Sequence, residues 1–184
     1  MNKLRGIRQG VLIACFLACS SGAAMLQDDF EGGTGNWTFG GSWGLSSVSS
    51  HSATQALTDS PGQLYSNNTD TSASLASDLD LSSATAPAVS FFHTYFLETN
   101  YDFGYLEIST DGGVTYEPTP LLSFTGQQTA WRREQVNLDA YAGQSNVRLR
   151  FRLVTERSVI MDGWTIDDMT LGERPDAVVL PSTP

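Results

Sequence analysis

The stretch VRLRFRLV at residues 147–154 decides the fold class, because apolar and basic residues alternate along it without a break. In an extended chain, alternate side chains point to opposite faces. One face would hold Val147, Leu149, Phe151 and Leu153, and the other Arg148, Arg150 and Arg152. This period of two predicts a strand with its apolar face in a core. We expect the arginine face to be solvated and paired with nearby acids.

Other segments carry the same kind of signal. Residues 88–97 are apolar on both faces, which predicts a central strand covered on both sides or covered by loops. Further strands are expected at 103–110, 114–117, 130–138 and 163–171, and Asp111-Gly112-Gly113 has the composition of a hairpin turn. Residues 42–85 contain 18 Ser or Thr residues with recurring apolar ones, which indicates short strands joined by long loops. No stretch of ten residues has helical periodicity. The prediction is an all-β, two-sheet jelly-roll β-sandwich.

The first 24 residues have the features of a signal peptide. Basic residues precede the apolar run at 11–18, which is too short to span a bilayer, and small residues lead to Ala24. We expect cleavage after Ala24 and export of the remaining chain. Both cysteines lie in this segment, so the mature chain would contain none. A disulfide framework, a cysteine–zinc site and a cysteine nucleophile are then excluded.

The two cysteines leave a second interpretation open. Residues 12–15 and 16–19 both resemble a bacterial lipobox, whose cysteine carries the lipid. Cys19 follows a proper apolar region but has an unusual Phe16, whereas Cys15 has better preceding residues and almost no apolar region. The protein is therefore expected to be secreted or at the cell surface, as a free protein, as a lipoprotein through Cys19 or Cys15, or through a retained membrane anchor.

The charge of the mature chain limits its partners. Removing residues 1–24 leaves seven arginines, no lysine and 20 acidic residues, a net charge of −13. Binding to nucleic acid requires clustered basic residues, so nucleic acid is not an expected partner. Docking on anionic lipid is disfavoured for the same reason. Chemistry that depends on a Schiff-base or phosphate-binding lysine is excluded.

Several motifs together resemble a known family. They are residues 29–31 (DFE), 56–62, 65–69, 90–95, 101–105 and 162–168 (DGWTIDD). Their order and spacing resemble the immune inhibitor A-like MAM domain of secreted bacterial proteins. The resemblance covers about residues 28–172 and implies a MAM-like or galactose-binding-like sandwich there. The prolines and the absence of a strand pattern at the end of the chain predict a flexible C-terminal tail at 173–184. In that family the domain is usually an appendage to peptidases, adhesins or cell-surface proteins. The zinc-peptidase motif His-Glu-x-x-His is absent from this sequence.

The resemblance also implies a structural Ca²⁺ between the first and last strands. Glu31 would supply one carboxylate, Asp167 or Asp168 another, and Asp59 is a further candidate. Calcium takes six to eight oxygens, so the loop at 49–55 would add carbonyls. Since neighbouring residues of a strand face opposite ways, at most one of Asp167 and Asp168 should point at a given ion. The alternative is that these are solvated acids at strand ends.

Other chemically suggestive motifs favour structural interpretations. Residues 109–116 match the Asp-box pattern, in which Asp111 bonds the amides of a hairpin turn. Ser42 lies in Gly-x-Ser-x-Gly, but a nucleophile elbow requires a following helix, which the sequence does not predict. His93 lies in an aromatic strand and is expected to be a core residue. His51 lies in a loop near the expected ion, and the two histidines alone make a weak case for zinc.

The aromatic residues leave two functions open. Exposed rings among Trp37, Trp43, Tyr65, Tyr101, Trp131, Tyr141 and Trp164 would stack on sugars, although most should be core residues. The first hypothesis is a non-catalytic, calcium-stabilised, exported domain that binds an extracellular protein or glycan in adhesion. The alternative is a carbohydrate-binding module. A secreted hydrolase comes third, because no triad, metal cluster or diagnostic acid pair is present, although glycosidases need only two carboxylates.

Overall fold

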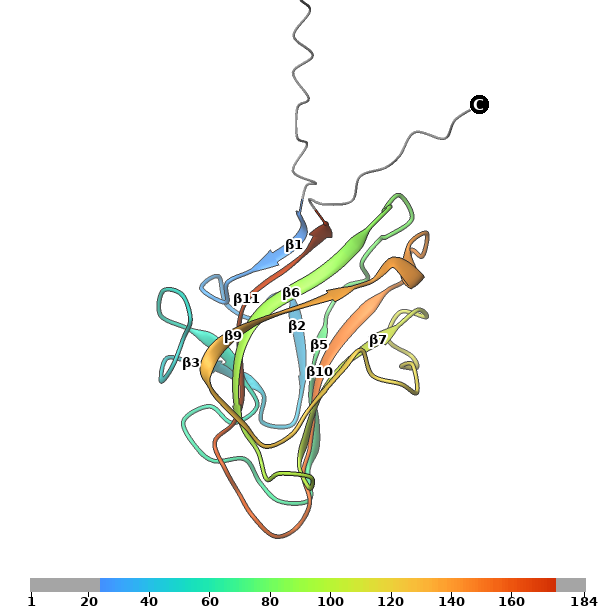
Figure 1. Ribbon diagram of the computed structural model, residues 1–184. Coiled ribbons are helices and arrows are strands. Elements are labelled where there is room, and N and C mark those ends of the chain that lie inside the picture. The colour runs from blue at the N-terminus through green and yellow to red at the C-terminus, as the bar shows by residue number, and fades with distance from the viewer. Residues whose placement is uncertain (1–23, 175–184) are drawn as a thin grey trace, which may run out of the picture.

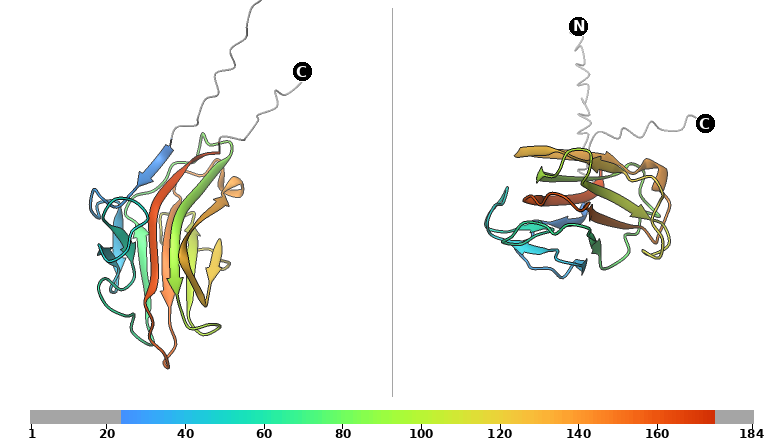
Figure 2. Two further views of the ribbon diagram at one scale, coloured as in Figure 1. Left: turned by 60° about the vertical axis from the view of Figure 1, so that its left-hand side comes forward. Right: turned by 90° about the horizontal axis from the view of Figure 1, so that it is seen from below.

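The computed structural model describes residues 24–174 and contains two antiparallel sheets packed face to face, as Figures 1 and 2 show. The strand order is β3-β4-β11-β6-β9 in sheet A, with β1 also paired to β11, and β2-β5-β10-β7-β8 in sheet B. The prediction of an all-β sandwich is confirmed. The expected signal peptide up to residue 23, the two cysteines and the tail from 175 onward lie outside the described residues.

The chain passes repeatedly between the two sheets. Sheet A consists of β1 (Ala24–Asp28), β3 (Gly44–Ser46), β4 (Ala56–Thr58), β6 (Pro87–Phe96), β9 (Gln127–Asn137) and β11 (Gly163–Glu173). Sheet B consists of β2 (Trp37–Gly40), β5 (Asp70–Leu75), β7 (Phe103–Ser109), β8 (Leu122–Phe124) and β10 (Arg148–Val154). A short 3-10 turn, η1 (Asp139–Tyr141), follows β9. The first and last strands pair with each other, so both ends of the described chain lie at the same end of the sandwich, at the top of Figure 1.

Strand β10 has the two faces that its sequence predicts. Its leucines and Phe151 are buried in the core, where Phe151 stacks on Trp37 with ring centroids 5.5 Å apart. Its arginines lie on the outer face of sheet B and pair with carboxylates of the neighbouring strands. Arg150 Nη2 lies 2.5 Å from Glu107 Oε2, and Arg152 Nη2 lies 2.7 Å from Asp70 Oδ2. The arginine stripe is thus neutralised within the fold.

Strand β6 is central in sheet A, between β11 and β9. Its inward side chains Val89, Phe91 and His93 are fully buried, and Tyr95 at its end is partly buried. Phe92 points outward, and the ring of His51 covers it in a stack with centroids 3.6 Å apart. A loop therefore covers part of the second apolar face of this strand. This outcome matches one of the two alternatives that its sequence left open.

The hairpin after β7 differs from expectation, because residues 114–117 do not form a strand. The turn is closed by side chains instead. Thr115 donates its N–H and its hydroxyl to Asp111, and Ser109 Oγ donates to Asp111 Oδ1 at 2.7 Å. These bonds hold the pKa of Asp111 well below its usual range. The Asp-box is therefore a structural turn here, as its pattern predicts, but no strand directly follows it.

The centre of the core is Trp164, on β11, which is fully buried and edge-on to Phe151 with centroids 5.3 Å apart. Its indole lies against Gly104 on β7 of the opposite sheet. A Cβ at Gly104 would come within 2.8 Å of Trp164 Cε3, so only glycine fits there. This contact fixes the separation of the two sheets where β11 starts. Within residues 24–174, no helix is long and apolar enough to cross a membrane.

Candidate functional site

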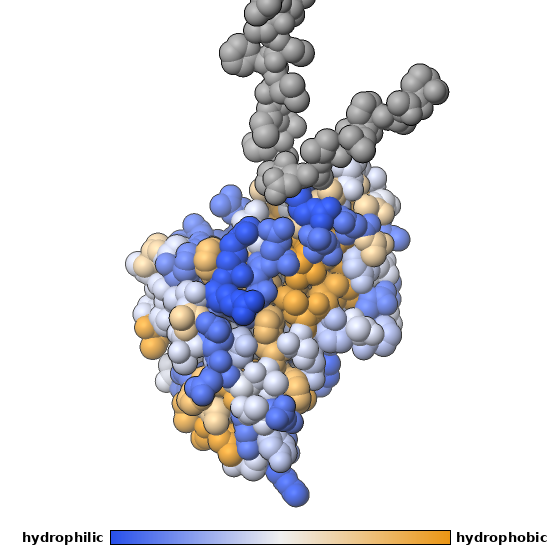
Figure 3. All heavy atoms as spheres, viewed as in Figure 1, coloured by the Kyte–Doolittle hydropathy of each residue, from blue (hydrophilic) through white to orange (hydrophobic). Residues whose placement is uncertain are grey.

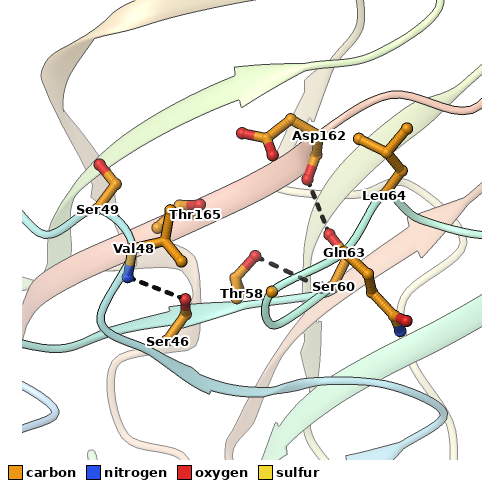
Figure 4. Close-up of a pocket in the computed structure, with 10 residues that line it drawn as sticks. Ser46, Val48, Ser49, Thr58, Ser60, Gln63, Leu64, Asp162 and Thr165 are labelled. Carbon is orange, nitrogen blue, oxygen red and sulfur yellow. Dashed lines mark hydrogen bonds between the residues drawn. The ribbon is translucent and has the colours of Figure 1, made fainter.

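A groove crosses the outer face of sheet A. It consists of two adjoining hollows of about 310 and 190 Å³, which share Ser49, Asp162 and Thr165. The larger hollow lies over β3 and β4, and the smaller one over the ends of β6 and β9. Figure 4 shows the larger hollow, with Ser46, Val48 and Ser49 on one side and Gln63 and Leu64 on the other. We call the two hollows together the sheet A groove.

The lining of the sheet A groove is rich in hydroxyl groups. They belong to Ser46, Ser49, Thr58, Ser60, Thr94, Thr129 and Thr165. Three apolar side chains at its edges are exposed to an unusual degree: Val48 by 81%, Leu64 by 49% and Phe96 by 40%. Asp162 is the only charged residue in the lining. Such a surface can accept and donate many hydrogen bonds and can cover apolar groups, but it has no nucleophile paired with a base.

Hydrogen bonds fix the wall of the groove that contains Asp162. Ser60 Oγ donates to the Asp162 carbonyl at 2.8 Å, and Tyr65 N–H donates to the Met161 carbonyl at 3.0 Å. Nearby, Tyr65 O–H donates to the buried carboxylate of Asp102 at 2.5 Å, which also accepts the N–H of Glu156. The loops at the end of the sandwich opposite the chain termini are therefore tied to one another.

Asp59 lies beneath the same wall, and the structure does not bring it to the other predicted calcium ligands. Its side chain is only 1% exposed, and Asp59 Oδ1 accepts the N–H of Trp164 at 2.6 Å. Asp59 Oδ2 is buried without a hydrogen-bond partner among the described residues. Burial raises the pKa of the Asp59 carboxyl to about 7. The residue thus has the environment of a neutral acid rather than of a hydrated carboxylate.

The other three predicted ligands converge on the loop at residues 47–55. Glu31 lies in the turn after β1, which ends at Asp28, and its carboxylate accepts the N–H groups of Thr54 and Gln55 at 2.8 and 2.7 Å. The Thr54 hydroxyl also donates to Glu31 at 2.6 Å, and these bonds lower the pKa of Glu31. Glu31 is therefore in contact with Thr54 and Gln55, which lie 23 and 24 positions later in the sequence.

Asp167 and Asp168 both reach the same loop, although the side chains of neighbouring strand residues were expected to face opposite ways. Asp167 Oδ2 accepts the N–H of His51 at 2.7 Å and of Ser52 at 2.9 Å. Asp168 accepts the Ser52 hydroxyl at 2.7 Å. The physical reason is a bulge in β11: the pairing with β6 shifts after Asp167, and Asp168 has a φ of 49°. The bulge interrupts the strict alternation of side chains.

The loop at 47–55 also joins the acidic side chains to the groove. Its first half contributes Val48 and Ser49 to the groove lining, and its second half bonds the three carboxylates. His51, between the two halves, stacks on Phe92 and lies edge-on to Trp131, with ring centroids 5.7 Å apart. His51 Nδ1 lies 2.6 Å from Asp168 Oδ2. Across residues 24–174, however, no three His, Cys, Asp or Glu side chains gather at metal-binding spacing.

The other residues that the sequence singled out, the aromatic rings, Ser42 and His93, lie outside the groove. Four of the seven candidate sugar-stacking rings, Trp37, Trp43, Tyr65 and Trp164, are buried in the core. Tyr101 is 60% exposed but does not line the groove. Ser42 is followed by strand β3 rather than by a helix, and its hydroxyl donates to the Asp59 carbonyl at 2.6 Å. His93 is fully buried and accepts a hydrogen bond from Trp164 Nε1 at 3.2 Å, which supports its expected place in the core.

The sequence interpretation missed the groove residues Val48, Asp162 and Thr165. Only one signal pointed to them: Thr165 lies between the apolar Trp164 and Ile166, so it had to face away from the core. In Figure 3 the side toward the viewer mixes hydrophilic and hydrophobic residues, with one hydrophobic patch near the middle and another at the lower end. The loops that contain Leu64 and Ile160 converge at that end in Figure 1.

Comparisons with known proteins support the fold. A family model described as Reelin subrepeat B matches residues 50–172. Bacillopeptidase F of Bacillus subtilis (strain 168) is 26% identical in an alignment of 160 positions that covers 80% of this chain. The K3 cleaved adhesin domain of Lys-gingipain from Porphyromonas gingivalis W83 has a TM-score of 0.60 at 18% identity, over 82% of this chain and 100% of that one. The C-terminal family 22 carbohydrate-binding module of Clostridium thermocellum has a TM-score of 0.57 at 14% identity, over 82% and 92% of the two chains.

These matches support different conclusions. The chain spans 11% of the length of Bacillopeptidase F, so the similarity concerns one part of that protein. The structural matches have low identity and therefore establish the sandwich fold alone. The expected resemblance to the immune inhibitor A-like MAM domain is confirmed as far as the β-sandwich, and the finer assignment stays a prediction.

Proposed function

Since the chain belongs to the Reelin subrepeat B family, we propose that it is an exported, non-catalytic binding domain whose ligand occupies the sheet A groove. The observation that carries this proposal is the groove itself, with its fixed wall, its exposed apolar edges and its many hydroxyl groups. The ligand is an extracellular protein or glycan, bound in adhesion at the cell surface or outside the cell. The likeness in fold to an adhesin domain and to a carbohydrate-binding module supports this function.

Export is part of the proposal. The basic residues, apolar run and small residues at 1–24 support removal of a signal peptide, with a lipid on Cys19 as the alternative form of attachment. In the structure Ala24 is the first residue of β1 and pairs with Gly172. Cleavage after Ala24 would remove only that one pair and keep β1 from residue 25 onward. A lipid on Cys19 would instead leave four residues between the anchor and β1.

A structural Ca²⁺ is the second part of the proposal. Glu31, Asp167 and Asp168 come from opposite ends of the domain and meet at the loop at 47–55, which also offers the hydroxyls of Ser52 and Thr54. Carboxylate, hydroxyl and carbonyl oxygens are the donors that Ca²⁺ prefers. A bound ion would offset the repulsion of three carboxylates in a mature chain of net charge −13 and would hold the first and last strands together. Asp59 is outside the proposed set because its carboxylate bonds Trp164.

The binding proposal can be tested with a substitution that fills the groove. Thr165 faces outward at the junction of the two hollows, so an arginine there would block both. Thr38, exposed on the outer face of sheet B, provides a matched control with the same change. We expect Thr165→Arg to reduce binding of the labelled full-length protein to the surface fraction of the cells that export it by at least tenfold, and Thr38→Arg to leave binding unchanged. Equal binding by both variants would contradict a site in the groove.

A carbohydrate-binding module is the second candidate function, and the composition of the lining favours it. The seven hydroxyl groups resemble the surface of a sugar in the hydrogen bonds that they can form. A protein ligand would instead be expected to bury a more apolar patch with aromatic anchors. The rings that line the groove are those of Tyr95 and Phe96 alone.

A further inference from the structure

We infer that the sheet A groove binds an uncharged oligosaccharide, with Asp162 as the polar anchor and Val48, Leu64 and Phe96 as apolar contacts. This inference rests on the proposed binding function. It adds the chemical class of the ligand, which the likeness in fold does not supply. It follows from the charge, the lining and the extent of the groove.

The charge of the groove argues against an acidic ligand. Asp162 is the only ionisable side chain in the lining, and no arginine or histidine lines either hollow. The mature chain around the groove is strongly negative overall, with 20 acidic residues and seven arginines. A uronate, a sialylated sugar or a phosphate would meet repulsion without a countercharge. A neutral ligand would not be repelled.

Asp162 is suited to anchoring hydroxyl groups. It lies just before β11, it is exposed, and its backbone carbonyl is fixed by the Ser60 hydroxyl. An ionised carboxylate accepts two or more hydrogen bonds and forms stronger ones than a neutral group does. Adjacent hydroxyls of a sugar ring are donors at the right spacing for its two oxygens. Figure 4 shows the Asp162 side chain above the hollow, between Ser49 on one side and Leu64 on the other.

The apolar edges of the groove fit the C–H faces of sugar rings. Val48 and Leu64 border the larger hollow, and Phe96 borders the smaller one. Exposure of 81%, 49% and 40% leaves these side chains in contact with water in the free protein. A sugar ring covers such a side chain with its apolar face and keeps its hydroxyls toward the Ser and Thr residues between the edges. This alternation of apolar and hydroxyl groups is the chemical pattern of a sugar rather than of a lipid or a peptide.

The extent of the groove indicates a chain of sugars rather than one ring. The two hollows together cross from β3 over β4, β11 and β6 to β9. Neighbouring strands lie about 4.8 Å apart, so four spacings make the groove about 19 Å long. A peptide that added to the sheet would need an unpaired strand edge, whereas this groove lies on the face of the sheet. Polysaccharide chains, which need only surface contacts, fit this position.

The test measures binding of neutral and acidic glycans by the full-length exported protein. Xylan, galactan and glucan form the neutral set, and polygalacturonate and alginate form the acidic set, with affinity electrophoresis as the readout. We expect retardation by at least one neutral glycan and by no acidic one. Asp162→Asn should weaken binding about tenfold, because it replaces a charge-assisted hydrogen bond with a neutral one. Glu117→Gln, an exposed acid outside the groove, is its control and should bind as wild type does.

A second pair of variants tests the apolar contact. Val48 and Val114 are 81% and 82% exposed, but only Val48 lines the groove. Val48→Ser should weaken binding to the neutral glycan several-fold, and Val114→Ser should not. Preferential binding of acidic glycans, or equal effects of the two valine changes, would overturn the inference. Absence of glycan binding, together with groove-dependent binding to the cell-surface fraction, would overturn it while leaving the proposed function intact.

Discussion

Asp59 should make the stability of the domain depend on pH in a way that one substitution removes. Its carboxyl group is 1% exposed, and burial raises its pKa from the usual 3.8 to about 7. The folded state therefore holds this proton more tightly than the unfolded state does. The contribution to stability is fully present below pH 3.8 and is lost as the pH rises through 7. Asp59→Asn keeps an oxygen that can accept the Trp164 N–H and cannot ionise.

The magnitude follows from the shift. One pKa unit corresponds to 1.36 kcal/mol, so a rise of about three units makes ionised Asp59 cost about 4 kcal/mol in all. Between pH 5 and pH 9 the unfolded state is already ionised while the folded state loses its proton. About two of the three units of pKa difference take effect in this range, which amounts to about 3 kcal/mol. The free energy of unfolding of wild type should therefore fall by about 3 kcal/mol relative to that of Asp59→Asn over this range. Taking the difference between the two proteins cancels the titration of every group that they share.

The assay is urea unfolding followed by tryptophan fluorescence at pH 5, 7 and 9, with the calcium concentration held constant. Trp164 donates to Asp59 and is fully buried, so its fluorescence reports on this part of the core. A constant difference between the free energies of unfolding of wild type and Asp59→Asn from pH 5 to pH 9 would contradict a raised pKa of Asp59. A difference that grew in the opposite direction would show that ionised Asp59 is stabilised by a partner, such as a cation.

Three further predictions concern the fold, the ion and export. Phe151→Asp should cost about 3 kcal/mol or more, because it places a charge in the core, and urea unfolding that showed a loss as small as about 0.5 kcal/mol, typical of a surface change, would contradict the position of β10. Calcium at a hundredfold excess over Kd should stabilise wild type by about 2.7 kcal/mol relative to EDTA, with a smaller rise in Tm for Glu31→Gln and Asp167→Asn, whereas an identical Tm in Ca²⁺ and EDTA would reject the ion. The intact mass of the exported protein should correspond to a chain beginning at Met25; a chain still beginning at Met1 would disprove cleavage, and a lipid mass on Cys19 would select the lipoprotein.

Patterns of period two account for what could be predicted from the sequence. The alternation in residues 147–154 placed β10 with its correct buried face, and the predicted strands at 130–138 and 163–171 correspond to β9 and β11. Local patterns could not reveal the bulge in β11, because the shift after Asp167 arises from pairing with β6, far away in the sequence. The expected strand at 114–117 does not form. Hydrogen bonds that Thr115 donates to Asp111 take the place of strand pairing there.

The candidate site was predictable only in part. The acids Glu31, Asp167 and Asp168 were picked out through a family resemblance, and the structure brings all three to one loop. The groove was not predicted, because its lining comes from five strands and three loops, and single Ser and Thr residues carry no signal in a sequence rich in them. A groove of this kind becomes visible only when the pairing of the strands is known.

The position of a bound neutral oligosaccharide is the most direct test of a binding site on sheet A. Backbone amide shifts of the labelled protein would be followed by NMR during titration with the best-binding neutral oligosaccharide. Our account predicts that the largest changes occur at Ser49, Thr94, Asp162 and Thr165, which line the two hollows. Changes confined to the outer face of sheet B, around Tyr116 and Arg150, which lie 3.7 Å apart in a cation–π contact, would contradict it.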